Sequence, residues 1–270
     1  MEARTALPRL FHLDLPQLKQ TGRLFPEQTG SNTIRRVLDI ASGSGEWTLA
    51  AAQVAPQIQF VGIESAAAQV EQAHRQAEAS GLRNLTFTNA DSFGHLEFPD
   101  NSFDLVNARY LVGLLPASAW PAMVKECVRV TRPGGIVRLT ETDMPITNSA
   151  AVEQLSTWIS QAYAKKQLSF SPTGRLLTIT PELKAFLQEA GCKQVRQVVW
   201  NTNFSMGMPA YTQVTQDLQR AYQLLLPFLV SSGEAKQEEA EQTYQQMLAE
   251  MQSEEFTGNA LSLTVWGVKG

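Results

Sequence analysis

The feature that most constrains this chain is the segment VLDIASGSGEWTL, residues 37–49, in which a largely apolar run leads through a glycine-rich turn into helix-forming residues. Residues 37–40 do not alternate between apolar and polar, which predicts a buried parallel strand. Gly43 and Gly45 allow a turn that residues with a Cβ would strain. A ligand can therefore approach bare backbone N–H groups at this strand end, where open α/β sheets bind ligands.

The pattern of this segment repeats along the chain as strand-like and helix-like stretches in alternation. Such alternation predicts βαβ units and a parallel sheet. We expect strands at residues 37–40, 59–63, 85–88, 103–107, 136–140 and 194–199, with a last strand near 261–265. We expect helices at 66–79, from about 118 to 132, at 148–166 and 181–190, and two with one apolar face each at about 211–225 and 240–251.

Composition and charge exclude several classes of function. The 270 residues are 43% hydrophobic and 18% charged, with a formal net charge of −4, which describes a globular protein without the basic surface of a nucleic-acid-binding protein. Cys127 and Cys192 lack metal-ligand spacing, and no N-terminal apolar run suggests a signal peptide or a membrane span. We therefore predict a cytoplasmic protein that binds no metal, nucleic acid or membrane.

Two acids follow the next two strands and narrow the choice of ligand. Glu64 ends the second strand, where a carboxylate can accept hydrogen bonds from ribose hydroxyls. Asp91 follows the third strand and suits an adenine amino group, with Phe93 available to pack on the ring. A dinucleotide site favours a third small residue where this chain has Thr48, and a P-loop would need Gly-Lys-Ser/Thr after the turn. A ligand that has a ribose and no phosphate fits best.

Five segments in this order resemble the class I S-adenosylmethionine-dependent methyltransferases: VLDIASGSGEW, FVGIE, NADSF, FDLVNAR and VTRPGGIVRLTE. The resemblance covers residues 35–142, and a closing strand at 260–268 also suits that family. It implies a Rossmann-like, doubly wound α/β fold whose seven-stranded, mostly parallel sheet has an antiparallel last strand and a helical cap. We expect one domain with an N-terminal cap at 1–33, a cofactor-binding half at 34–142, a substrate-side half at 143–200, a helical insertion at 201–258 and a closing strand at 259–270.

The resemblance also assigns roles to residues that would bind the cofactor, S-adenosylmethionine. The first turn would hold its methionine portion, the end of the second strand its ribose, and the segment after the third strand its adenine, while Asn107 would form a wall beside the methyl group. The residues concerned are Asp39, Ala41, Ser42, Gly43, Gly45, Glu64, Ser65, Asp91, Ser92, Phe93 and Asn107. Ala41 departs from the family, which usually has glycine there, and alanine suits the turn only where φ is negative.

The acceptor of the methyl group is less constrained by the sequence. We expect the cap to bind a small, largely apolar metabolite, with Arg109, Tyr110, Met206 and Tyr211 as candidate contacts and S-adenosylhomocysteine as the other product. Glu141, Asp143 and His12 are candidate bases if the acceptor must lose a proton. Glu141 and Asp143 could equally be surface residues or caps after a strand. Two alternatives stay open, a non-methylating reaction such as a cyclisation and a non-catalytic binding module, and the oligomeric state is not predicted.

Overall fold

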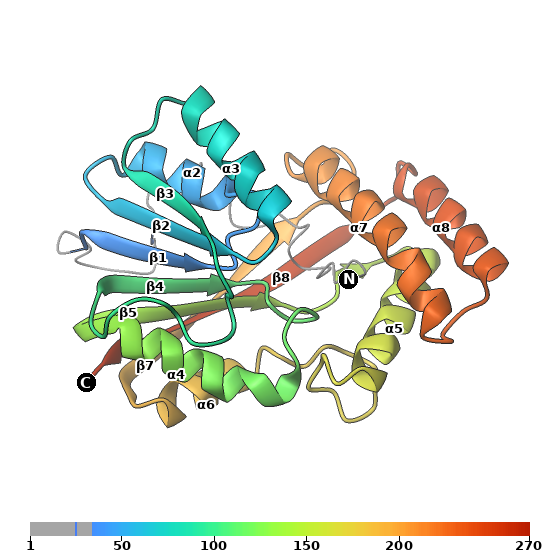
Figure 1. Ribbon diagram of the computed structural model, residues 1–270. Helices are drawn as coiled ribbons and strands as arrows, with labels where there is room; N and C mark the ends of the chain where they lie inside the picture. The colour runs from blue at the N-terminus through green and yellow to red at the C-terminus, as the bar shows by residue number, and fades with distance from the viewer. Residues whose placement is uncertain (1–24, 26–33) are drawn as a thin grey trace.

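The computed structural model describes residue 25 and residues 34–270, which form a twisted sheet with helices on both faces (Figure 1). The predicted N-terminal cap at 1–33 and the candidate base His12 lie outside the described residues, apart from Phe25. Within the described residues, no helix is both long enough and apolar enough to cross a membrane. The predicted cytoplasmic location stays a prediction.

The first half of the sheet is built from βαβ units. Its elements are β1 (Arg36–Ile40), α2 (Glu46–Val54), β2 (Gln59–Glu64), α3 (Ala67–Ala79), β3 (Leu85–Asn89) and β4 (Phe103–Arg109). The strands are parallel and lie in the order β3-β2-β1-β4. The chain therefore changes direction across the sheet between β1 and β4, and such a switch point is where doubly wound sheets bind ligands.

The second half adds the strands on the other side of β4 and most of the helices. Its elements are η3 (Ala117–Ala119), α4 (Trp120–Val130), β5 (Thr131–Thr142), β6 (Ile146–Thr147), α5 (Ala150–Lys165), α6 (Glu182–Glu189), β7 (Cys192–Asn203), α7 (Tyr211–Ser231), α8 (Gln237–Met251) and β8 (Gly258–Lys269). Strand β8 runs antiparallel to both β5 and β7. The predicted mostly parallel sheet with an antiparallel last strand is confirmed.

Strand β6 is the one strand that the sequence did not indicate. It pairs with β8 through Ile146 and Asn259, after β5 has paired with β8 through Thr142 and Ser262, so β6 continues the line of β5. Among residues 34–270, the sheet thus has eight strands. A two-residue strand is too short to show an alternating pattern, which explains why it was missed.

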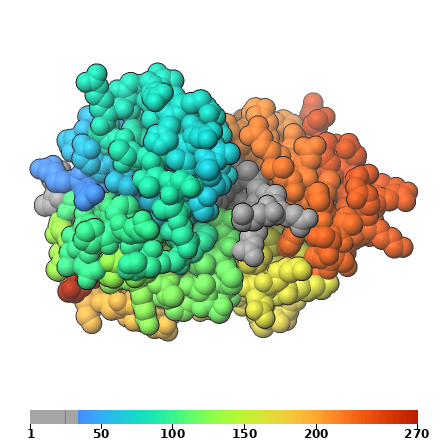
Figure 2. Space-filling view, in the orientation of Figure 1, coloured from blue at the N-terminus to red at the C-terminus, as the bar shows by residue number. Residues whose placement is uncertain are grey.

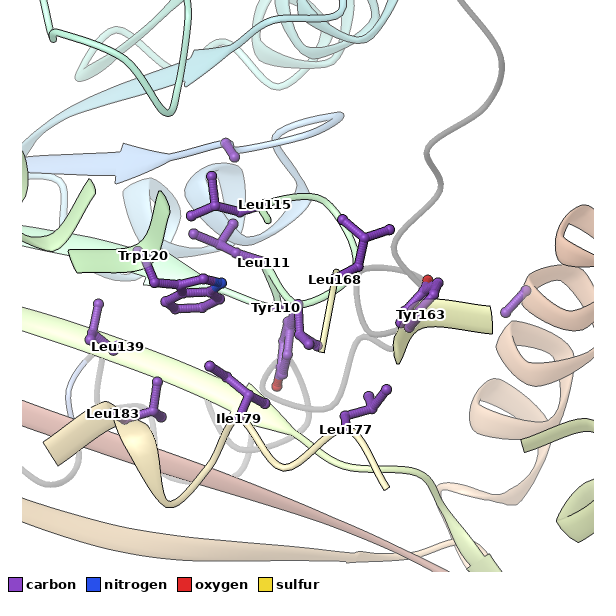
Figure 3. Close-up of a cluster of buried hydrophobic side chains, with 14 of the residues drawn as sticks. Tyr110, Leu111, Leu115, Trp120, Leu139, Tyr163, Leu168, Leu177, Ile179 and Leu183 are labelled. Carbon is purple, nitrogen blue, oxygen red and sulfur yellow. The ribbon is translucent and has the colours of Figure 1, made fainter. Parts of the chain in front are cut away.

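The hydrophobic core lies on both faces of the sheet. Helices α2 and α3 cover one face, and α4 and α6 cover the other (Figure 1). On the α4 and α6 face, Leu139 of β5 lies in one buried cluster with Trp120 of α4 and Leu183 of α6 (Figure 3). The Trp120 ring stacks on Phe186 with 5.9 Å between ring centroids. This packing fixes β4 and β5, whose carboxyl ends carry several of the candidate residues.

Helices α5, α7 and α8 form a helical cap beyond the carboxyl ends of β1 and β4 (Figure 1). Figure 2 shows α7 and α8 in orange as a lobe beside the blue and green half of the molecule that contains β1–β4. Helix α5 begins at a favourable N-cap, because the Ser149 hydroxyl accepts a hydrogen bond from the Val152 N–H at 3.0 Å. Glu250 of α8 accepts a 2.5 Å hydrogen bond from the same hydroxyl and a 3.0 Å bond from the Ala151 N–H. The cap is therefore held by polar contacts as well as by apolar packing.

Candidate functional site

The glycine-rich turn joins β1 to α2 through three residues in the left-handed backbone region. These are Ala41, Gly43 and Gly45, with φ of 51°, 61° and 80°. The Ser42 N–H donates to the Ile63 carbonyl at 2.8 Å, which ties the turn to the end of β2. Alanine in this region costs about 1 to 2 kcal/mol relative to a right-handed conformation. Ala41 therefore has the positive φ at which an alanine strains this turn.

Two glycines leave room for an aromatic ring beneath the turn. A Cβ on Gly45 would lie 2.5 Å from the Phe87 ring, and a Cβ on Gly62 would lie 2.6 Å from it. Phe87 of β3 thus supports the turn from below, a role that the sequence reasoning missed. The signal was available, because a glycine inside a strand, as in FVGIE, often marks the close approach of another group.

Glu64 meets the turn as predicted from its place at the end of β2, and its carboxylate is already hydrogen-bonded. Its Oε2 accepts the Gly43 N–H at 3.1 Å. Its Oε1 accepts the Ala66 N–H at 3.0 Å and the Ser65 hydroxyl at 3.2 Å. The residue is only 4% exposed. A ligand hydroxyl would therefore bind a carboxylate held in a fixed orientation and would share it with, or displace, the Ser65 hydroxyl.

The three candidate residues after β3 differ in how accessible they are. Asp91 is exposed, and its Oδ1 accepts the Phe93 N–H at 2.9 Å, which closes the turn after the strand. Ser92 is buried, and its hydroxyl donates to the Ile63 carbonyl at 3.4 Å. Phe93 is half-buried against the hydrophobic core. The Asp91 carboxylate is thus the polar side chain of this group that faces solvent.

A buried polar row crosses three neighbouring strands below the turn. Asp39 of β1 pairs in register with Asn107 of β4, which pairs with Arg138 of β5. The Asn107 amide donates to Asp39 Oδ1 at 2.9 Å, and Arg138 donates to Asn107 Oδ1 at 2.9 Å. Thr48 of α2 donates to Asp39 Oδ2 at 2.7 Å. The sequence reasoning assigned no role to Arg138 or to the Thr48 hydroxyl.

This row gives Asn107 a structural role. Its side chain is fully buried and both ends of its amide are hydrogen-bonded, to Asp39 and to Arg138. The Asn107 side chain thus orients Asp39, and the wall beside the methyl group stays a prediction. Asp39 is itself 1% exposed, so it stabilises the turn and α2 from below rather than presenting an open carboxylate.

The two candidate substrate contacts at the end of β4 lie in different surroundings. The Arg109 guanidinium lies 3.6 Å from Asp39 and 4.7 Å from the centre of the Trp47 ring. Tyr110 has a φ of 54°, and its ring is buried in the cluster that contains Leu111 and Ile179 (Figure 3). The Tyr110 side chain belongs to the hydrophobic core, and its expected contact with substrate stays a prediction.

The two candidate bases at the end of β5 bind backbone groups. Glu141 is buried and accepts the Leu111 N–H at 2.5 Å. Asp143 accepts the N–H groups of Met144, Leu177 and Thr178 at 2.9, 2.9 and 3.1 Å. Glu141 thus anchors the segment after β4, and Asp143 anchors the segment before α6. The role of Glu141 and Asp143 as catalytic bases stays a prediction.

The two candidate substrate contacts in the cap also have structural contacts. The Tyr211 hydroxyl donates to the Met251 carbonyl at the end of α8 at 2.8 Å, and its ring lies 6.4 Å from the Phe256 ring. The Met206 N–H donates to the Phe256 carbonyl at 2.9 Å, and its side chain packs on the core. Tyr211 thus joins α7 to α8, and Met206 joins the segment before α7 to the segment after α8. Their expected role in substrate binding remains a prediction.

The carboxyl edge carries no cluster of metal ligands in the part of the chain that the structure describes. No group of three or more His, Cys, Asp or Glu side chains among residue 25 and residues 34–270 is arranged to hold a metal ion. A polar cavity of about 140 Å³ lies between α5 and α8, lined by Asn148, Ser149, Glu250, Ser253, Glu255 and Phe256. The candidate site is therefore defined by the turn and the strand ends.

Comparison with known proteins places this geometry in context. Residues 37–135 match the family model described as a methyltransferase domain. The chain is 33% identical over 112 residues to the demethylmenaquinone methyltransferase of Geobacillus stearothermophilus, which covers 41% of this chain and 47% of that protein. It is 31% identical over 132 residues to the same enzyme of Symbiobacterium thermophilum, which covers 48% of this chain and 52% of that protein. The chain thus spans about half the length of the relatives that it matches.

Two solved structures resemble the whole chain. The YcgJ protein of Bacillus subtilis superimposes with a TM-score of 0.56 at 18% identity, covering 96% of this chain and 99% of that one. A putative methyltransferase of Bacillus halodurans gives a TM-score of 0.57 at 18% identity, covering 95% and 98%. At this identity the likeness concerns the fold.

Proposed function

Because this chain belongs with the class I S-adenosylmethionine-dependent methyltransferases, as its match to the methyltransferase domain over residues 37–135 shows, we propose that it methylates a small, largely apolar molecule. The family resemblance predicted from the five sequence segments is confirmed. The transfer reaction and the acceptor are our proposal.

The observation that carries the proposal is the contact between Glu64 and the glycine-rich turn. It places a fixed carboxylate, a buried aromatic support and bare backbone at one strand end, which suits a ribose that carries no phosphate. The Ser42 hydroxyl is buried in the same turn without a hydrogen-bond partner among the described residues, so it offers the ligand one more polar group. S-adenosylmethionine has the ribose and lacks the phosphate.

The protein's share of the reaction is orientation and exclusion of water. When bound, S-adenosylmethionine supplies an activated methyl group, so the chain must align an acceptor with it. Glu64 and the turn would hold the ribose, and Asp91 would contact the adenine. Glu141 and Asp143 would fix the segments around the acceptor through their backbone contacts. An acceptor that arrives ionised needs no base, and His12 stays a candidate for one that does not.

An apolar acceptor would bind against the cap. Its helices bury Tyr163, Leu218, Leu225 and Met247 in one cluster with residues of the sheet. The relatives named above are demethylmenaquinone methyltransferases, and their match covers less than half of this chain. Demethylmenaquinone is therefore the first acceptor to test, followed by smaller phenols and carboxylic acids.

The test uses the purified protein with S-adenosylmethionine that carries a deuterated methyl group. Mass spectrometry should detect a labelled product with one of these acceptors, and calorimetry should detect binding of S-adenosylhomocysteine. Glu64→Gln should weaken that binding by about 10- to 100-fold, since one or two hydrogen bonds to a charged group are lost. Binding without any methylated product would favour the non-methylating alternative. Absence of binding to the wild-type protein would contradict the proposal.

A further inference from the structure

Asn89, the last residue of β3, holds the turn by which the chain leaves β2. It pairs in register with Glu64, the last residue of β2. Its side-chain Nδ2 donates to the Glu64 carbonyl and to the Ser65 carbonyl, both at 3.0 Å. An asparagine amide has two N–H groups, so it can bind both carbonyls at once. One side chain thus bridges the two residues at which the strand ends.

This bridge fixes a change of backbone direction. In an extended strand, consecutive carbonyl groups point to opposite sides, so one amide reaches two of them only where the chain turns. The Glu64 carbonyl also accepts the Ala90 N–H at 3.1 Å, which continues the ladder between β2 and β3. The ladder therefore holds the Glu64 carbonyl, and the Asn89 amide extends that hold to Ser65.

The turn that Asn89 holds supplies two of the hydrogen bonds on the Glu64 carboxylate. Oε1 of that carboxylate accepts the Ala66 N–H at 3.0 Å and the Ser65 hydroxyl at 3.2 Å. Oε2 accepts the Gly43 N–H of the glycine-rich turn at 3.1 Å. If the turn at residues 65–66 shifts, the direction in which the carboxylate faces a ligand shifts with it. Asn89 therefore acts on the ligand site through Glu64.

Building on the proposed function, we propose that Asn89 is a positioning residue for the ribose of the cofactor. Its amide holds the turn at residues 65–66, the turn orients the Glu64 carboxylate, and that carboxylate binds the ribose hydroxyls. The sequence reasoning gave Asn89 no role, although it ends the strand that precedes Asp91. Asn89 is exposed, so its replacement should change the ligand site more than the stability of the core.

The test compares two ligands by calorimetry on wild type and on Asn89→Leu, which keeps the size of the side chain without its N–H groups. The ligands are S-adenosylhomocysteine and its 2′,3′-dideoxy analogue, which lacks both ribose hydroxyls. Wild type should bind S-adenosylhomocysteine about 10- to 100-fold more tightly than the analogue, because the hydroxyls bind a charged group. In Asn89→Leu this preference should fall about 5-fold or more, since the freed turn must be ordered again on binding. The analogue should bind both proteins within about twofold.

Three further variants keep the test decisive. Asn89→Gln keeps the amide and should retain part of the preference. Thr86→Val, at an exposed position of the same strand, is the matched control and should behave as wild type. In the Glu64→Gln background, Asn89→Leu should change the affinity for S-adenosylhomocysteine by less than about twofold, because Asn89 acts through Glu64. Urea unfolding checks that every variant is folded.

The inference is overturned if Asn89→Leu keeps the wild-type preference, or if it weakens the binding of both ligands equally, which would leave Asn89 a purely structural role. It is also overturned if wild type binds S-adenosylhomocysteine without preferring it to the analogue, because Glu64 then does not bind the hydroxyls. If wild type binds neither ligand, the proposed function itself fails.

Discussion

The cofactor half and the helical cap use buried polar side chains in different ways. In the cofactor half, Glu64 binds backbone N–H groups of the turn, and Asp39 binds the start of α2 through Thr48. In the cap, polar side chains join one helix to another: Ser156 of α5 bonds to Tyr222 of α7 at 2.6 Å, and Glu250 of α8 binds the start of α5. Polar groups thus shape a ligand edge in one region and fix helix packing in the other.

The difference also lies in how far apart the partners are in the sequence. Glu64 and Gly43 are separated by 21 residues, which is one βαβ step. Ser149 and Glu250 are separated by 101 residues. Contacts of the first kind follow from the alternation of strands and helices, whereas those of the second kind depend on how whole helices dock. The following changes should separate the two regions experimentally.

The largest effect is expected from Asp39→Asn in the cofactor half. The substitution removes a buried negative charge beside Arg109 and disturbs the hydrogen bonds from Thr48 and Asn107. We expect the free energy of unfolding in urea to fall by about 3 to 5 kcal/mol. The control is Asp100→Asn, whose exposed ion pair with Arg129 should contribute less than about 1 kcal/mol. A loss below 1 kcal/mol for Asp39→Asn would show that this row does not anchor the site.

A smaller effect is expected from Asp143→Asn at the junction between the two regions. One oxygen that accepts backbone N–H groups becomes an NH₂ group, so we expect the free energy of unfolding to fall by about 2 kcal/mol. Because Asp143 binds backbone N–H groups of the segment before α6, the pH dependence of methyl transfer in Asp143→Asn should have the same shape as in wild type. A large fall in rate with unchanged stability would instead assign Asp143 to the chemistry.

In the cap, Tyr222→Phe should lower the free energy of unfolding by about 1 to 2 kcal/mol, because it leaves the buried Ser156 hydroxyl without the Tyr222 hydroxyl as its partner. Adding Ser156→Ala should recover part of the loss, and binding of S-adenosylhomocysteine should stay within twofold of wild type. Urea unfolding and calorimetry measure the two quantities. If Tyr222→Phe loses cofactor binding, the hydrogen bonds of the cap contribute to the cofactor site, and the two regions do not act separately.

The same phenol predicts an alkaline effect. Burial raises the pKa of Tyr222 above its usual range, although the hydrogen bond with Ser156 opposes the shift. A tyrosine in the unfolded chain has a pKa near 10, so above pH 10 the unfolded state loses this proton while the folded state keeps it. Stability is thus present below pH 10 and falls above it. Between pH 9 and 11, wild type should lose stability faster than Tyr222→Phe, and equal slopes would contradict this account.

The smallest effect is expected from Ala41→Gly in the turn. Glycine relieves the left-handed strain at φ 51° but adds freedom to the unfolded chain, so we expect a net gain of about 0.5 kcal/mol. The matched change in the cap, Ala162→Gly within α5, should cost at least about 1 kcal/mol, since it lies in a helix interior. If Ala41→Gly and Ala162→Gly lower the free energy of unfolding by equal amounts, the turn is not strained at Ala41.

Most of the fold and part of the site could be predicted from the sequence, for physical reasons that particular residues illustrate. Gly43, Glu64 and Asp91 follow strands whose apolar runs are visible, and parallel strands bring their carboxyl ends to one edge. The positive φ of Ala41 could not be predicted, because alanine carries no conformational signal. The hydrogen bonds of Glu141 with Leu111 and of Asp143 with Leu177 also could not be predicted. The sequence pattern of an acid at a strand end is the same whether the carboxylate binds a ligand or a backbone N–H group.

The most direct test of the account is a crystal structure of the protein with S-adenosylhomocysteine, because the central claim is an order along the carboxyl edge. We expect the adenine at β3 beside Asp91 and the ribose hydroxyls at β2, within about 3 Å of the Glu64 carboxylate. The sulfur should then lie over the turn, with the amino acid end at β4. A ligand whose ribose lies out of hydrogen-bonding reach of Glu64, or whose adenine lies over β4, would contradict the account.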